Sequence, residues 1–134
     1  MKKLFVLGLL VANSAFAYDL TVKSPRVIDG DTIDTGYVVF EHTTPIHLRI
    51  YGIDTPELHG KCDKEKAKAK EAKEFLKQTV KNEDVGINII SWDKYGGRIV
   101  GVPYVLDVPL NEEMIRRGYA VAYTGGKKTM NWCK

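Results

Sequence analysis

Residues 47–57 read His-Leu-Arg-Ile-Tyr-Gly-Ile-Asp-Thr-Pro-Glu, and this stretch decides the fold. Its first half alternates polar and apolar residues in the manner of a strand. Pro56 favours an extended backbone at Thr55 and ends the strand, because proline cannot donate to a hydrogen-bond ladder. The second half is then a tight polar turn at the end of a sheet, where oxygen atoms can converge on a cation.

The same stretch carries groups that suit phosphodiester chemistry. Arg49 projects from the strand five residues before Asp54. A guanidinium stays charged and can grip two phosphate oxygens at once. A carboxylate at Glu57 can accept a proton from water. The alternatives are that these carboxylates are solvated loop residues and that Arg49 snorkels or pairs with Asp54 for structural reasons only.

Three strands joined by short turns are predicted over the first part of the chain. They cover Tyr18–Val27, Thr32–Phe40 and Pro45–Ile53. Asp29-Gly30-Asp31 lies between the first two and is a turn signal, so Asp31 could serve only to build that turn. This order indicates an antiparallel meander.

A long helix is predicted over Asp63–Lys81, which is rich in Ala, Lys and Glu. One face of it would consist of Ala72, Phe75, Leu76, Thr79 and Val80, at the spacing of successive helical turns. Asp63 can cap its N-terminus. Its lysines could form a nucleic-acid patch, but the interspersed acids favour a solvated helix face.

Two more strands and a short helix complete the predicted architecture. Asp84–Trp92 and Arg98–Leu106 flank a hairpin signal at residues 93–97, and a helix over Leu110–Arg117 stops at Gly118. Five strands with the long helix between the third and fourth, and a short helix after the fifth, are typical of an OB-fold barrel. The predicted class is therefore mainly β with helices, which does not by itself give a function.

Residues 1–17 have the three parts of a secretory signal peptide. Lys2 and Lys3 precede an apolar run, and Ala15-Phe16-Ala17 is a small-x-small cleavage pattern. Cleavage is expected after Ala17; removing 17 of the 134 residues leaves residues 18–134 as one domain. The run is too short for a membrane anchor, so a periplasmic or secreted monomer is expected. The alternative is a buried N-terminal helix.

Charge and cysteine content bear on which partners, bonds and metal sites can be expected. Without Lys2 and Lys3, the 20 basic residues fall to 18 against 17 acidic ones, so bulk charge does not indicate a nucleic-acid binder. Cys62 and Cys133 are an even pair in an exported chain, which predicts a disulfide. The cysteines and histidines have no zinc-ligand spacing.

Four motifs together resemble the staphylococcal-nuclease (thermonuclease) family. They are residues 27–32, Arg49 with residues 53–57, residues 93–96 followed by Arg98, and residues 110–118. Each is weak alone, but in this order and at these spacings they are specific and span nearly all of the mature chain. The resemblance implies a Ca²⁺-dependent nuclease that acts on DNA and RNA and leaves 3′-phosphate and 5′-hydroxyl ends.

The resemblance also implies a role for each site residue. The metal would bind the carboxylates of Asp31 and Asp54 and the backbone carbonyl of Thr55, an oxygen-only set of the kind that Ca²⁺ prefers. Glu57 would be the general base or would orient water. The phosphate would be contacted by Arg49 and Arg98, and the nucleotide by Lys94, Tyr95 and Tyr123.

The chain departs from the family pattern before Arg98 and after Tyr123, and the family's type member also lacks Cys62 and Cys133. A second glycine, Gly97, stands before Arg98, and simple strand extension would turn this arginine to the opposite face. Because glycine takes positive φ at little cost, we expect Gly96-Gly97 to absorb the extra residue and Arg98 to face the phosphate site. Thr124 follows Tyr123 where the family's type member soon has another tyrosine, and Tyr123 could instead be a packed core residue.

The predicted function is an exported, Ca²⁺-dependent nuclease without sugar specificity. Two alternatives stay open. A non-catalytic OB-fold binder of single-stranded nucleic acid would rely on aromatic and basic groove residues and need no carboxylate cluster. A secreted interaction module would need an exposed apolar patch.

Overall fold

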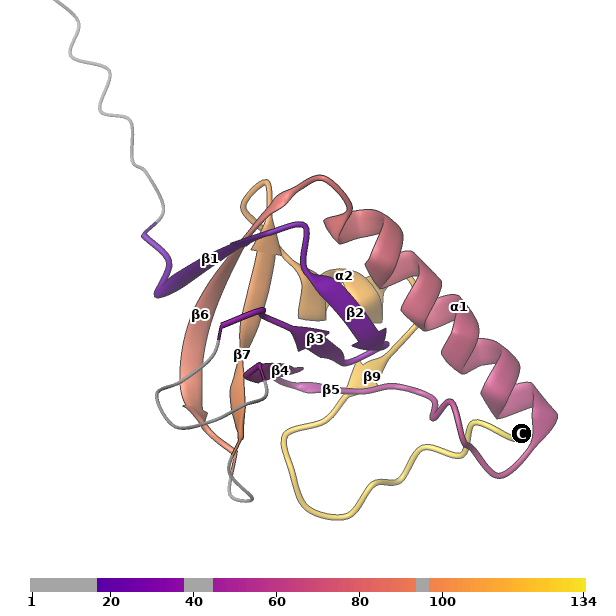
Figure 1. Ribbon diagram of the computed structural model, residues 1–134. Coiled ribbons are helices and arrows are strands. Elements are labelled where there is room, and N and C mark those ends of the chain that lie inside the picture. The colour runs from indigo at the N-terminus through magenta and orange to yellow at the C-terminus, as the bar shows by residue number, and fades with distance from the viewer. Residues whose placement is uncertain (1–16, 38–44, 94–96) are drawn as a thin grey trace, which may run out of the picture.

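The computed structural model describes residues 17–37, 45–93 and 97–134. Over these residues a curled, mainly antiparallel sheet lies beside the long helix α1 (Asp63–Val80), and the short helix α2 (Leu110–Arg116) packs near the sheet as well (Figure 1). This arrangement confirms the predicted class of a mainly β fold with two helices. The predicted signal peptide lies almost wholly outside the described residues. In the part of the chain that is described, no helix is long and apolar enough to cross a membrane.

The main sheet has the strand order β1-β6-β7-β4-β3-β2. The short strand β8 pairs with the C-terminal end of β7. All of its neighbours are antiparallel except β4 and β7, which run parallel and place Arg49 opposite Val100. A small second sheet pairs β5 with β9. The strands are β1 (Leu20–Lys23), β2 (Arg26–Asp29), β3 (Thr32–Asp34), β4 (His47–Ile50), β5 (Ile53–Asp54), β6 (Asp84–Trp92), β7 (Arg98–Val105), β8 (Val108–Pro109) and β9 (Val121–Ala122).

Two of the predicted strands are each broken in two. The first breaks at Ser24, whose φ of 45° ends β1, so β1 joins β6 while β2 continues into the meander. The third breaks at Gly52, where φ is 81°. Such a backbone is cheap only for glycine. The break turns β5 out of the main sheet. Residues 53–57, which carry Asp54 and Glu57, follow directly after this break. The antiparallel β2-β3-β4 meander itself is confirmed.

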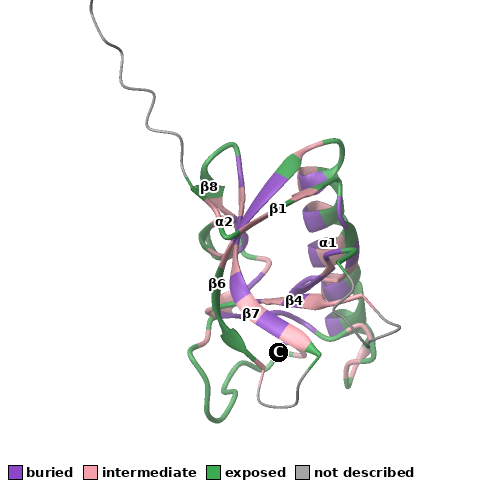
Figure 2. Cartoon of the chain, turned by 60° about the vertical axis from the view of Figure 1, so that its left-hand side comes forward, coloured by how far each residue is buried: buried purple, intermediate pink, exposed green. Residues whose placement is uncertain are grey.

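The core lies between α1 and the concave face of the sheet, and Figure 2 shows buried positions along the side of α1 that faces it. Ala72, Leu76 and Val80 are buried as predicted, and Phe75 stacks on Tyr119 with ring centroids 4.7 Å apart. Each fully buried leucine contributes about 2 kcal/mol. Close packing of α1 and β2 leaves little space at Gly30, where an added Cβ would lie 3.1 Å from the Cβ of Ala72.

The predicted cap of α1 is wrong by one residue. Cys62 is the N-cap, and its sulfur accepts a hydrogen bond from the Glu65 amide at 3.4 Å. Asp63 is already helical, because the extended backbone that the cap position requires falls on Cys62. Asp63 still adds a favourable negative charge in the first turn.

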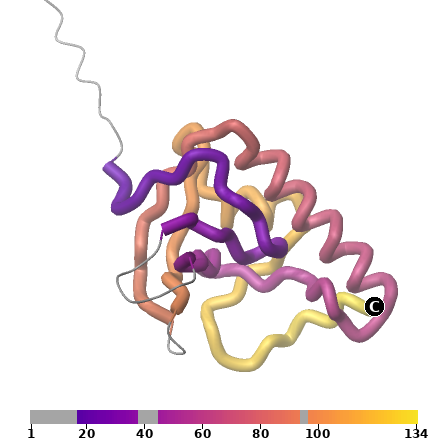
Figure 3. Tube along the Cα trace, in the orientation of Figure 1, coloured from indigo at the N-terminus to yellow at the C-terminus, as the bar shows by residue number. Residues whose placement is uncertain are grey.

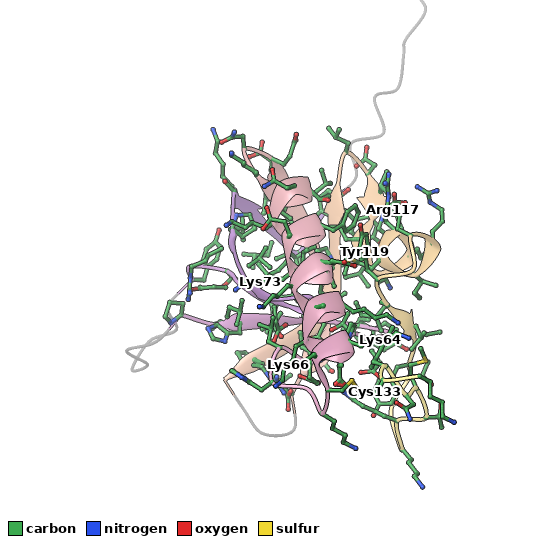
Figure 4. The ribbon with its side chains drawn as sticks, turned by 90° about the vertical axis from the view of Figure 1, so that its right-hand side faces the viewer. Lys64, Lys66, Lys73, Arg117, Tyr119 and Cys133 are labelled. Carbon is green, nitrogen blue, oxygen red and sulfur yellow. A yellow bond between two sulfur atoms is a disulfide. The ribbon has the colours of Figure 1, made fainter. Side chains whose placement is uncertain are left out.

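The C-terminal segment returns to the beginning of α1 (Figure 3). The predicted disulfide between Cys62 and Cys133 is present, with Cα atoms 6.0 Å apart. Lys64 Nζ also donates to the carbonyl of Lys134 at 2.6 Å, and Figure 4 shows Lys64 and Cys133 at the same end of the helix. Trp132 is buried beneath this end. The tail is therefore anchored at its far end rather than loose.

Candidate active site

One cleft, about 790 Å³ in volume, collects most of the residues that the sequence singled out. It lies where β2, β3, β4 and β7 meet the returning tail. Its walls include five of the predicted site residues, Asp31, Arg49, Glu57, Arg98 and Tyr123, together with Asp29, Thr32, Ser91, Trp92, Asp93, Val100, Gly125, Gly126 and Lys128. Asp54 and Thr55 are buried directly behind this wall.

Arg49 is fixed on one side of the cleft by Asp31. Its Nη1 lies 3.1 Å from Asp31 Oδ2, and Arg49 also donates to the carbonyls of Ile50 and Ile53, at 2.9 and 3.1 Å. Strand register explains the pairing, because Arg49 stands opposite Thr32, the neighbour of Asp31. The guanidinium therefore does not snorkel, and its charge is placed next to the metal ligand predicted at Asp31.

Asp31 has more than one partner. Thr55 Oγ1 donates to Asp31 Oδ2 and Thr32 Oγ1 donates to Oδ1, both at 3.0 Å. Burial raises the pKa of Asp31 above its usual value, although the Arg49 charge and the Thr55 hydrogen bond oppose the rise. Another cation in the cleft would favour the ionised carboxylate. Asp31, in the turn just before β3, is thus joined to Thr55, the residue that follows Asp54.

Asp54 and Glu57 share a cation that the sequence analysis missed. Lys128 Nζ lies 2.8 Å from Asp54 Oδ1 and 3.5 Å from Glu57 Oε1. Burial alone would lower the pKa of Lys128, but the hydrogen bond to Asp54 and the two carboxylate charges raise it overall. Lys128 sits in a polar tail without periodicity. The only available signal was the predicted disulfide, which returns the tail to the residues just after Glu57.

Arg98 lines the same cleft as Arg49. Gly97 before it has a φ of 73°, a backbone that other residues rarely adopt. Gly97 thus stands just before β7 in a conformation that glycine favours, and β7 begins its parallel pairing with Arg98 opposite His47. Arg98 Nη2 lies 2.5 Å from Asp93 Oδ2, a partner that the sequence analysis did not anticipate.

The predicted nucleotide contacts are only partly described. Lys94 and Tyr95 lie outside the described residues. Tyr123 is half-buried at the cleft rather than packed in the core, and its hydroxyl donates to the carbonyl of Gly126 at 2.6 Å. Trp92, which was not predicted, also lines the cleft and is 59% exposed. Trp92 therefore presents an exposed ring on which a base can stack, whereas Lys128 Nζ already lies 5.8 Å from the centroid of the Tyr123 ring.

The donor chemistry of the cleft fits a hard cation. Asp31, Asp54 and Thr55 offer only oxygens, and Lys128 already places a positive charge on Asp54. No group of three or more His, Cys, Asp or Glu side chains able to share an ion is found among the residues that the structure describes. A metal here would therefore depend on two carboxylates, the Thr55 carbonyl and additional ligands such as water or phosphate.

Comparison with known proteins gives the family. The family model described as staphylococcal nuclease homologue matches residues 47–131, which is more than half of the chain. The chain belongs to the staphylococcal nuclease family. The match begins at β4 and contains Arg49, Asp54, Thr55, Glu57 and Arg98, whereas Asp31 lies before it. The family is one of metal-dependent nucleases, in keeping with the oxygen donors of the cleft.

Several relatives of this chain are named as nucleases. A thermonuclease of Staphylococcus hyicus is 32% identical over 83% of this chain and 64% of its own length. An uncharacterized endonuclease of Escherichia coli is 30% identical over 78% of this chain and 62% of its own length. A "probable endonuclease" of Schizosaccharomyces pombe is 36% identical over 60% of this chain and only 37% of its own length. The chain thus spans less than two thirds of each of these relatives.

Proposed function

We propose that this protein is an exported, Ca²⁺-dependent nuclease that hydrolyses phosphodiester bonds in DNA and RNA and leaves 3′-phosphate and 5′-hydroxyl ends. The observation that carries the proposal is the 3.1 Å pairing of Arg49 with Asp31 in a cleft that also contains Glu57 and Arg98. The cleft thus holds two arginines and the solvent-exposed carboxylate of Glu57 around one space. Asp31, Asp54 and the Thr55 carbonyl would hold the ion, which supplies charge stabilisation at the phosphoryl oxygens when bound.

In this proposal, side chains of the protein carry out the other steps of the reaction. Arg49 and Arg98 hold the oxygens of the scissile phosphate, where charge builds up as water attacks phosphorus. Glu57, whose side chain is 62% exposed, is open to solvent and takes the proton of that water. The bond from phosphorus to the 5′-oxygen breaks, and this oxygen gains a proton and leaves as the 5′-hydroxyl. The phosphate stays on the 3′-oxygen.

Recognition of the substrate in this proposal does not depend on the sugar. The arginines bind phosphate, and Trp92 and Tyr123 present ring faces on which any base can stack. Lys94 and Tyr95 are further proposed nucleotide contacts, on the basis of the family resemblance. Such a cleft accepts DNA and RNA alike.

We further propose that the mature form is a periplasmic or secreted monomer comprising residues 18–134. The signal-peptide pattern and the Cys62–Cys133 disulfide support export, since such bonds persist in oxidising compartments. Amino-terminal sequencing of the exported protein should begin at Tyr18, and gel filtration should give one chain.

One experiment tests the catalytic proposal. The exported protein is incubated with plasmid DNA and with RNA, in Ca²⁺ or in a chelator, and the product ends are determined by their reaction with kinase and phosphatase. Cleavage should require Ca²⁺, and Zn²⁺ should not replace it. Asp31→Ala and Asp54→Ala should each shift the Ca²⁺ response to higher concentrations. Full activity in chelator would refute the metal assignment.

The exposed aromatic faces of the cleft favour one alternative, a binder of single-stranded nucleic acid that does not cleave. Trp92 and Tyr123 would suffice for it. Binding of single-stranded DNA with no cleavage at any Ca²⁺ concentration would establish this alternative.

A further inference from the structure

Lys128 occupies a place in the cleft where a metal ion would be expected to act. Its Nζ is 2.8 Å from Asp54 Oδ1 and 3.5 Å from Glu57 Oε1. The Asp54 side chain is only 6% exposed and does not line the cleft, whereas Lys128, its partner, does. The two groups that it bridges are the proposed metal ligand and the proposed base.

The backbone on both sides of Lys128 holds this residue beside Asp54 and Glu57. Before it, β9 pairs with β5, and the Tyr123 amide donates to the Gly52 carbonyl at 2.9 Å. Gly125 and Gly126 then bend the chain back with φ values of 117° and 78°. After it, the Cys62–Cys133 disulfide anchors the end of the tail. Residues 125–131 therefore form a strap that is tied at both ends across the cleft.

The contacts of the strap itself are weaker than those of its anchors. Residues 124–131 are exposed to solvent, and the Lys128 side chain is 44% exposed. Water partly screens the Lys128 end of the pair, but Asp54 is only 6% exposed, and leaving this carboxylate without a cation would cost free energy. Lys128 therefore leaves when another cation replaces it at Asp54. The strap can thus leave Asp54 while β9 and the disulfide stay in place.

We propose that Lys128 is a built-in counter-cation of Asp54 and Glu57, and that Ca²⁺ binding at Asp54 displaces it together with the strap. This inference rests on the proposed metal site. A divalent ion and an ammonium repel each other and cannot both contact Asp54 Oδ1 without strong cost. Once displaced, Lys128 remains beside the cleft that holds Arg49 and Arg98, where a phosphate can become its new partner.

The test compares Lys128→Gln with Lys127→Gln by calorimetric Ca²⁺ titration without nucleic acid. Both variants lose one positive charge from the same tail, but Lys127 forms no ion pair within the described part of the chain. Lys128→Gln should bind Ca²⁺ about 3- to 10-fold more tightly than the wild type, the effect of removing one competing ion pair. Lys127→Gln should change the affinity by less than about 2-fold, since that charge is exposed and screened.

A second measurement separates displacement from simple charge removal. The side-chain NMR resonances of Lys128 should move to the positions typical of a free lysine when Ca²⁺ is added to the wild type. Those of Lys127 should stay unchanged. Equal Ca²⁺ affinities of the two variants, or Lys128 resonances that do not move while Ca²⁺ binds to the wild type, would overturn the inference while leaving the nuclease proposal intact. If no variant binds Ca²⁺, both the inference and the proposed metal site fail.

Discussion

Arg49 Nη1 on β4 and Asp31 Oδ2, in the turn just before β3, lie 3.1 Å apart. The pair is largely shielded from water, with side chains 18% and 11% exposed. Arg49 additionally binds the carbonyls of Ile50 and Ile53 on either side of the strand break at Gly52. A single guanidinium thus joins the meander to the turn that carries Asp54 and Glu57.

Arg49→Lys should lower the rate of DNA cleavage by about 10²- to 10³-fold, because an ammonium cannot reproduce the planar fork on phosphate. It should also cost about 1–2 kcal/mol of stability, since one ammonium cannot satisfy both carbonyls and Asp31. Steady-state kinetics and urea unfolding measure the two effects. The matched control is Arg26→Lys, at an exposed pair with Asp34, which should change neither. Unaltered cleavage by Arg49→Lys would remove Arg49 from the phosphate site.

Glu57→Gln should retain nucleic-acid binding but lose at least about 10²-fold in rate, because the shape is kept while the proton acceptor is lost. The melting temperature should stay within about 1 °C, since the side chain is exposed and surface substitutions are nearly neutral. Single-turnover cleavage and binding in chelator separate the two properties. Glu112→Gln, an exposed change on α2 away from the cleft, is the control and should behave as wild type. A Glu57→Gln protein that turns over normally would favour a different base.

Arg98→Ala tests whether the inserted glycine leaves this arginine functional. We expect the rate to fall by about 10²-fold, the scale for losing one stabiliser of the transition state. Stability should fall by about 1 kcal/mol, because Arg98 is 38% exposed but its partner Asp93 is only 10% exposed and loses an ion pair. Cleavage at the normal rate would show that Arg98 does not act on the phosphate despite lining the cleft.

Gly97→Ala tests the backbone explanation for Arg98. The Cβ of an alanine there would lie more than 4 Å from the described atoms beyond its immediate chain neighbours, so we expect the effect to come from the φ of 73° rather than from a clash. We expect a cost of about 1 kcal/mol in stability and a reduced cleavage rate as the turn relaxes. Gly97→Asn should do less harm, because asparagine tolerates the left-handed region better. Identical behaviour of the two variants would argue against a role for this φ value.

The disulfide should contribute substantially to stability. It closes a loop of 71 residues, for which chain entropy gives about 4 kcal/mol as a model-dependent upper figure. Reductant should therefore lower the melting temperature of the wild type. The control is the double variant Cys62→Ser/Cys133→Ser, whose serine can still cap α1 and which should not respond to reductant. An unchanged melting temperature of the wild type under reduction would contradict this prediction.

The sequence by itself determined the features that depend on neighbours along the chain. Periodicity over residues 63–81 indicated α1, and the polar turn after Ile53 indicated where carboxylates would gather. Gly97 was expected to absorb the insertion before Arg98, because local backbone freedom is a property of the residue itself. The order of the motifs was enough to predict the family, and an even cysteine count in a chain expected to be exported was enough to predict the disulfide.

Only the tertiary structure decided which distant residues share the cleft. Nothing near Lys128 in the sequence points to Asp54; the contact exists because β9 and the disulfide together fix the path of the tail. The Arg49–Asp31 pair likewise depends on strand register, and the N-cap passed from Asp63 to Cys62 because of the direction from which the chain enters α1. Contacts between segments far apart in sequence depend on strand register, the disulfide and packing. These cannot be read from the local composition around either residue.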